Sequence, residues 1–82
     1  MAIEVFKYTK PNCGPCVLVG NYLNEHDVKN IERDVYEFTE EYQKLGVFGT
    51  PVVAAFKDGE QVFLSVGFKE AELEKLVELV NE

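Results

Sequence analysis

The chain has 82 residues, of which 46% are hydrophobic, and it carries a net charge of −7. A chain of this length has room for one compact domain, and we expect residues 1–82 to form it. The acidic excess repels phosphate backbones and anionic lipid surfaces, so neither nucleic acid nor a membrane is expected as a partner. No apolar run approaches the roughly 20 residues that span a bilayer, and no charged segment leads into an apolar signal core. These features predict a cytoplasmic protein.

The first part of the chain predicts a strand, a helix and a second strand. Residues 2–8 alternate loosely between apolar and polar side chains and end at a turn-rich segment, which indicates the first strand. From residue 14 to about 25 the apolar positions fit a helix, and Pro15 falls in its first turn, where a missing N–H costs little. Residues 28–34 show a weaker strand pattern, but a βαβ unit requires a strand there, so we predict the second strand over this range.

A short helix is predicted next. Phe38, Tyr42 and Leu45 follow the i, i+4, i+7 spacing of one helix face, and two glutamates fall where a first turn favours acids. We expect Thr39 to cap this helix and Gly46 to follow its end.

The last part of the chain predicts a hairpin and a terminal helix. The apolar run at residues 51–56 and the run at 61–66 flank an Asp-Gly pair, which is a strong hairpin signal. Beyond it, apolar residues recur at helical spacing, namely Leu73, Leu76, Val77 and Val80. The element order is therefore βαβαββα. A right-handed crossover makes the first two strands parallel, so we predict an α/β fold with a four-stranded mixed sheet flanked by three helices.

The two cysteines of the chain form a Cys-Gly-Pro-Cys motif at the junction between the first strand and the first helix. A helix N-terminus carries a partial positive charge of about +0.5 e, which favours thiolate over thiol. Cys13 precedes the helix and is expected to attack, whereas Cys16 lies a turn inside and is expected to resolve the mixed disulfide. Gly14 and Pro15 shape the turn. A change of about 1.4 kcal/mol in the relative stability of the disulfide and dithiol forms shifts the reduction potential by about 30 mV. This spacing predicts redox chemistry.

A metal site is the alternative reading of the two cysteines. Zinc takes about four ligands, and His26 is the one histidine, so a site within the chain would need carboxylates. We therefore expect no metal and no cofactor beyond a redox-active disulfide. A binding module in which two chains hold a metal or cluster between their motifs remains the non-enzymatic alternative.

The segment from Tyr8 to Cys16, together with Gly-Thr-Pro-Val at residues 49–52, resembles the thioredoxin superfamily. The resemblance covers essentially the whole chain and implies a minimal thioredoxin fold with thiol–disulfide oxidoreductase activity. It also implies that Pro51 is a cis-proline facing the disulfide and that the backbone of Thr50 pairs with an extended substrate.

Two branches of the superfamily meet in this chain. The Cys-Gly-Pro-Cys motif looks like thioredoxin, whereas the short length and the segment at residues 8–11 look like glutaredoxin. Small glutaredoxin-like redoxins combine such features. That resemblance implies a monomer that reduces ribonucleotide reductase or other protein disulfides and is recycled by a thioredoxin reductase. The alternative is a glutaredoxin recycled by glutathione.

The chain also departs from both branches. Asn12 stands where thioredoxins have tryptophan, and Lys7 stands where they keep a buried acid. The glutathione-binding segment of glutaredoxins aligns with residues 66–70, where Gly67 is retained but a second glycine and an aspartate are missing. Residues expected to contact substrate are Thr50, Pro51, Lys10, Tyr8 and Gly67, although Tyr8 fits the core better. Phe48, Val66 and Phe68 have two alternative interpretations: an expected apolar rim around the cysteines that recognises partner chains, or burial in the core.

Overall fold

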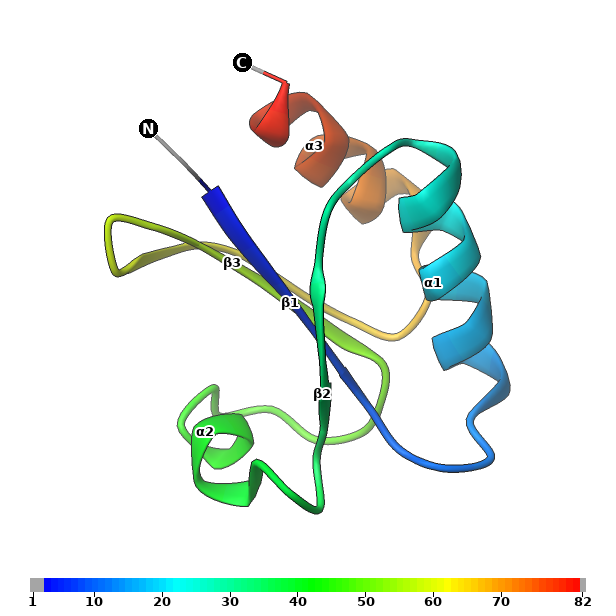
Figure 1. Cartoon of the computed structure of the whole chain (residues 1–82), viewed down its shortest axis with the longest axis vertical. Coiled ribbons are helices and arrows are strands. Elements are labelled where there is room, and N and C mark those ends of the chain that lie inside the picture. The colour runs from blue at the N-terminus through cyan, green and yellow to red at the C-terminus, as the bar shows by residue number, and fades with distance from the viewer. Residues whose placement is uncertain (1–2, 82) are drawn as a thin grey trace.

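The computed structural model describes residues 3–81 (Figure 1). Within that range the elements follow in the order β1 (Ile3–Thr9), α1 (Gly14–Glu25), β2 (Ile31–Asp34), α2 (Thr39–Gln43), β3 (Val52–Lys57), β4 (Glu60–Val66) and α3 (Glu70–Val80). The predicted element order is confirmed. Residue 2, the expected start of the first strand, lies outside the described residues.

The strands of the described chain form one four-stranded sheet in the order β2-β1-β3-β4. Strand β1 runs parallel to β2 and antiparallel to β3, and β4 is antiparallel to β3. The predicted mixed sheet is therefore confirmed. Because β1 is an inner strand, the turn that follows it lies at the end of the sheet between β2 and β3.

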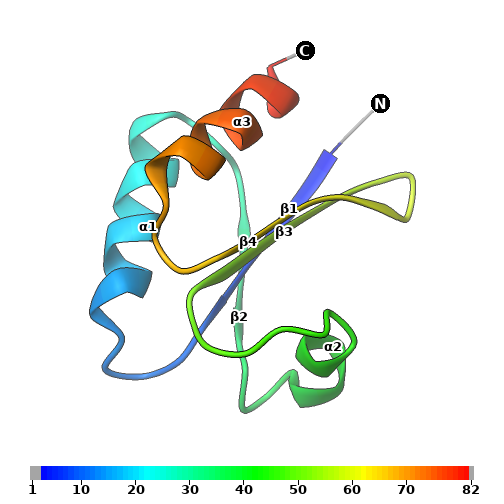
Figure 2. The same cartoon turned by 180° about the vertical axis from the view of Figure 1, so that it is seen from behind.

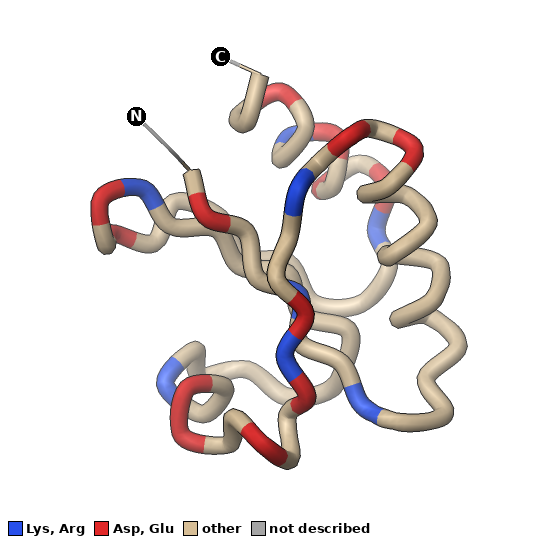
Figure 3. The backbone as a smooth tube through the Cα atoms, in the orientation of Figure 1, with Lys and Arg blue, Asp and Glu red and all other residues tan. Residues whose placement is uncertain are grey.

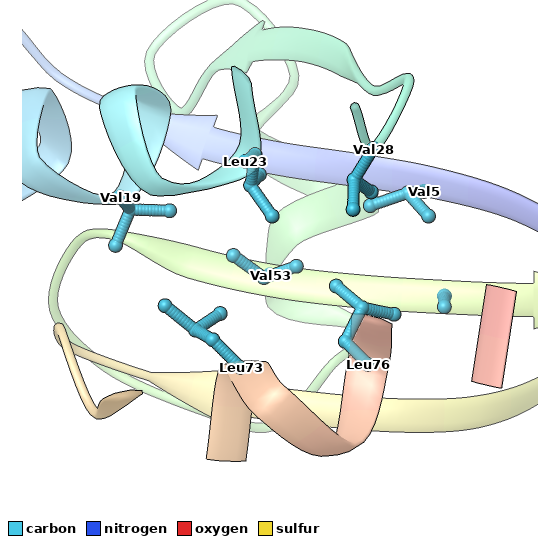
Figure 4. Packing of buried hydrophobic residues seen from close by; sticks show 8 residues of the cluster. Val5, Val19, Leu23, Val28, Val53, Leu73 and Leu76 are labelled. Atoms are coloured by element: carbon cyan, nitrogen blue, oxygen red, sulfur yellow. The ribbon is translucent and has the colours of Figure 1, made fainter. Parts of the chain in front are cut away.

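Helices α1 and α3 cover one face of the sheet, and α2 covers the other (Figures 1 and 2). Alternate residues of a strand point to opposite faces, so β3 contributes Val53 to one side and Val52 to the other. The larger cluster lies under α1 and α3 and includes Val5, Val19, Leu23, Val28, Val53, Leu73 and Leu76 (Figure 4). Truncating one such leucine to alanine typically costs about 2–5 kcal/mol. This packing fixes α1 on the sheet.

The turn between β3 and β4 confirms the Asp-Gly hairpin signal. Asp58 has φ 53° and Gly59 has φ 83°, and a tight hairpin turn requires positive φ at both central residues. Aspartate tolerates this conformation and glycine adopts it freely.

The predictions for two segments need correction. Thr39 is not the N-cap of α2: Phe38 occupies that position, and the Thr39 hydroxyl instead donates a hydrogen bond of 3.0 Å to the Val35 carbonyl. Helix α2 also ends at Gln43, before Leu45. The second strand begins at Ile31 and not at Val28, because Val28 is buried in the large cluster and its N–H donates to the Leu23 carbonyl.

Within the described residues, no helix has the length and apolar character needed to cross a membrane.

Candidate active site

The Cys-Gly-Pro-Cys motif occupies the junction between β1 and α1. Cys13 is the N-cap of α1, and its Sγ accepts a hydrogen bond of 3.2 Å from the Cys16 N–H. A left-handed Asn12, with φ 59°, turns the chain immediately before it. The two cysteines form a disulfide, with their Cα atoms 5.3 Å apart. The predicted disulfide pair is therefore placed at the start of the helix.

The two sulfur atoms differ in access. Cys13 is half-buried, whereas Cys16 is only 5% exposed. The first turn of α1 carries no acidic side chain, so no carboxylate of that turn opposes a thiolate at the helix N-terminus. Gly14 and Pro15 of the first turn are exposed. This arrangement leaves Cys13 as the sulfur that a second protein can reach.

The loop that contains Thr50 and Pro51, distant from the motif in sequence, approaches Cys13. The Thr50-Pro51 peptide bond is cis, as the family resemblance implied. The Thr50 hydroxyl lies 3.5 Å from the Cys13 Sγ, and the Gly67 N–H donates a hydrogen bond of 2.7 Å to the Pro51 carbonyl. Gly67 has φ 82°, a conformation that favours glycine. Thr50, Pro51 and Gly67 are therefore joined to each other and to Cys13.

A cavity of about 630 Å³ opens beside the motif, under α1. Its lining includes Lys7, Lys10, Cys13, Cys16, Gly20 and Glu32. Lys10 is exposed at this cavity, on the segment that joins β1 to the motif. The expected contact between Lys10 and substrate stays a prediction.

Tyr8 belongs to the core and not to a substrate surface. Its side chain is buried with Val52 and Ala54 on the α2 face of the sheet. The hydroxyl donates a hydrogen bond to the Glu41 carboxylate. Burial and this carboxylate raise the pKa of Tyr8 above its ordinary value, so the hydroxyl stays protonated at neutral pH. Of the two interpretations weighed from the sequence, the burial of Tyr8 supports the core.

An apolar groove beside α2 was only partly anticipated. It has a volume of about 450 Å³ and is lined by Val35, Tyr36, Thr39, Tyr42, Gln43, Gly46, Val47 and Phe48. Phe48 is 92% exposed, two residues before Thr50. Phe68 and Val66, the other expected members of an apolar rim, are half-buried and pack on the core clusters. Tyr36 carried no sequence signal of its own, since its exposure depends on how β2 meets α2.

Among residues 3–81, no group of three or more His, Cys, Asp and Glu side chains is placed to hold a metal ion.

Comparison with known proteins identifies the family. The family model described as Glutaredoxin matches residues 5–60. The SPbeta prophage-derived thioredoxin-like protein YosR of Bacillus subtilis is 40% identical over 76 residues, which cover 92% of this chain and 95% of that protein. A thioredoxin of the same organism is 42% identical over 78 residues, covering 88% of this chain and 73% of that protein. A solved thioredoxin from Halobacterium salinarum has a TM-score of 0.80 at 28% identity, covering 98% of this chain and 75% of that one. The chain therefore belongs to the glutaredoxin family within the thioredoxin superfamily, and it is a thiol–disulfide oxidoreductase.

Proposed function

We propose that this protein is a cytoplasmic, monomeric electron carrier that reduces protein disulfides and is recycled by a thioredoxin reductase. Ribonucleotide reductase is the proposed acceptor of first choice. The redox group that we propose for the carrier is the Cys13–Cys16 pair alone, with no further cofactor. The observation that supports this function best is the half-buried Cys13 beside the Thr50 hydroxyl, with Cys16 buried behind it.

The reaction needs two sulfur exchanges. The Cys13 thiolate attacks one sulfur of a partner disulfide, which forms a mixed disulfide and releases the other partner sulfur as a thiolate. The Cys16 thiolate then attacks the Cys13 Sγ, which forms the internal disulfide and releases the second partner thiolate. Two electrons pass to the partner, and both released thiolates take protons from water. A reductase supplies two electrons to restore the dithiol.

Two features favour a thioredoxin reductase over glutathione as the reductant. The glutathione-binding segment retains Gly67 alone, and the residues after it are Phe68, Lys69 and Glu70. In addition, the relatives with 40% and 42% identity are named as a thioredoxin-like protein and a thioredoxin.

A recycling assay tests this proposal. The oxidised protein is expected to support steady NADPH oxidation with a bacterial thioredoxin reductase, and little with glutathione and glutathione reductase. Ribonucleotide reductase, insulin and a small aromatic disulfide serve as acceptors in parallel. Faster recycling by glutathione would contradict the proposed reductant, and reduction of insulin without turnover of ribonucleotide reductase would contradict the proposed acceptor. Neither result would alter the dithiol chemistry.

Phe48 is expected to contribute to protein recognition. The exposed Phe48 ring lines an apolar groove two residues before Thr50, and it loses water when a partner covers it. Phe48→Ala is expected to lower kcat/KM for insulin by about tenfold, since a buried aromatic anchor contributes 1–2 kcal/mol or more. Reduction of a small aromatic disulfide is expected to stay within about twofold of the unmodified protein, because such a substrate needs no wide surface.

Val62→Ala is the matched control, because Val62 is also exposed but lies on β4. Equal losses for insulin and for the small disulfide in Phe48→Ala would show that the ring affects the motif and not the partner.

A further inference from the structure

Lys7 points from β1 toward α1. It shares the strand face of Val5, whose side chain packs in the cluster under α1 and α3. The Lys7 side chain is only 12% exposed, and its Nζ lies 3.0 Å from Oε1 of Glu32. The two residues are directly opposite each other in the parallel register of β1 and β2. The sheet therefore holds a lysine ammonium beneath the helix that carries the motif.

The ammonium reaches the same face of α1 as Cys16. A Cβ atom placed on Gly20 would lie 2.8 Å from Lys7 Nζ, so the glycine makes room for the lysine. Gly20 follows Cys16 by four residues, and residues at this spacing are neighbours on one helix face, with Cβ atoms about 5–6 Å apart. Lys7, Cys16 and Gly20 also line the same cavity. Lys7 Nζ is therefore about one helical turn from the buried cysteine.

Few other charges face this space. The charged residues in the lining are Lys7, Lys10 and Glu32, and α1 itself is uncharged until Glu25 at its end (Figure 3). Glu32 is 65% exposed, so water screens its carboxylate more strongly than it screens the ammonium. Lys10 is exposed on the loop before the motif. The positive end of the Lys7–Glu32 pair is thus the charge that acts most directly on Cys16.

We propose that Lys7 is a positioning residue that stabilises the thiolate of Cys16. Its ion pair with Glu32 orients the ammonium, and the absence of a side chain at Gly20 leaves space for it. This inference rests on the proposed dithiol function. The thiolate is needed twice: as the nucleophile that resolves the mixed disulfide, and as the leaving group when a reductant's thiolate attacks Cys13 Sγ. In the first step Cys16 loses its proton to water through the open cavity, and in the second the departing sulfur carries the negative charge beside the ammonium.

The ionisation of Cys16 can be measured directly. In a Cys13→Ser background, Cys16 is the one thiol, and its thiolate is followed by ultraviolet absorbance at 240 nm against pH. Lys7→Met, which keeps the length of the side chain and removes the charge, is expected to raise the pKa of Cys16 by about one unit, a tenfold loss of thiolate at neutral pH. Glu32→Gln leaves the ammonium unneutralised and is expected to lower the same pKa. Lys57→Met removes an exposed lysine at the hairpin and is expected to shift nothing.

The two variants test the proposal from opposite directions. An unchanged or lowered Cys16 pKa in a folded Lys7→Met variant would overturn it. If Lys7→Met does not fold by circular dichroism, Glu32→Gln decides, because an unchanged or raised pKa in that variant would overturn it equally. Insulin reduction by the unmodified protein tests the dithiol function separately, so failure of the electrostatic role and failure of the proposed function are distinguishable.

Discussion

Cys13→Ser is expected to lower protein-disulfide reduction on the order of 10³-fold or more, because a serine hydroxyl stays protonated at neutral pH and is a poor nucleophile toward sulfur. Cys13 is the half-buried sulfur of the motif, and the buried Cys16 cannot replace it as the first attacking group. The measurement is the rate of insulin reduction with dithiothreitol as the electron source, so that the result does not depend on which reductase serves the protein.

The serine variant is expected to keep the fold, since serine is itself a favoured N-cap and its oxygen is able to accept the hydrogen bond from the Cys16 N–H. Thermal unfolding of the variant, compared with the reduced unmodified protein, checks this point. A folded variant that still reduced insulin at a tenth of the original rate would show that Cys16 attacks first and would reverse the assignment of the two sulfurs.

Elements bounded by strong local signals could be predicted from the sequence. Pro15 in the first turn of α1 and the Asp-Gly pair between β3 and β4 act through their own backbone preferences, so their effect does not depend on distant residues. Val28 shows where local reasoning fails. Its apolar side chain suggested a strand, but packing against Val5 and Leu23 keeps it in the connection before β2. Helix α2 is short for a similar reason, since few of its residues are anchored in the core.

Some parts of the candidate site could likewise be predicted from the sequence, whereas others depend on tertiary structure. The cysteine motif and the Thr50-Pro51 pair are visible in the sequence because their chemistry depends on residue type and spacing. The Lys7–Glu32 pair is not visible, because it exists only through the register of β1 on β2, 25 positions apart in the chain. The hydrogen bond from the Tyr8 hydroxyl to Glu41 likewise depends on the position of α2 on the sheet. Strand pairing and helix placement therefore supply what residue type alone could not.

Cys16→Ser is expected to stop the reaction at the mixed disulfide. After Cys13 has attacked a partner, only a thiolate close to Cys13 Sγ resolves the intermediate rapidly, and Cys16 is that group in the described chain. The variant is expected to accumulate a covalent adduct on Cys13 in close to equal molar amount, and its turnover to fall on the order of 10²-fold or more, because slow exchange with external thiols remains. Mass spectrometry of the alkylated reaction mixture measures the adduct, and added dithiothreitol should release it.

The unmodified protein and Cys13→Ser are the matched controls, and neither is expected to retain an adduct. Rapid turnover by Cys16→Ser without any adduct would mean that an external thiol performs the second step, as in a monothiol glutaredoxin cycle. The buried sulfur, and with it the ammonium of Lys7, would then have no part in catalysis.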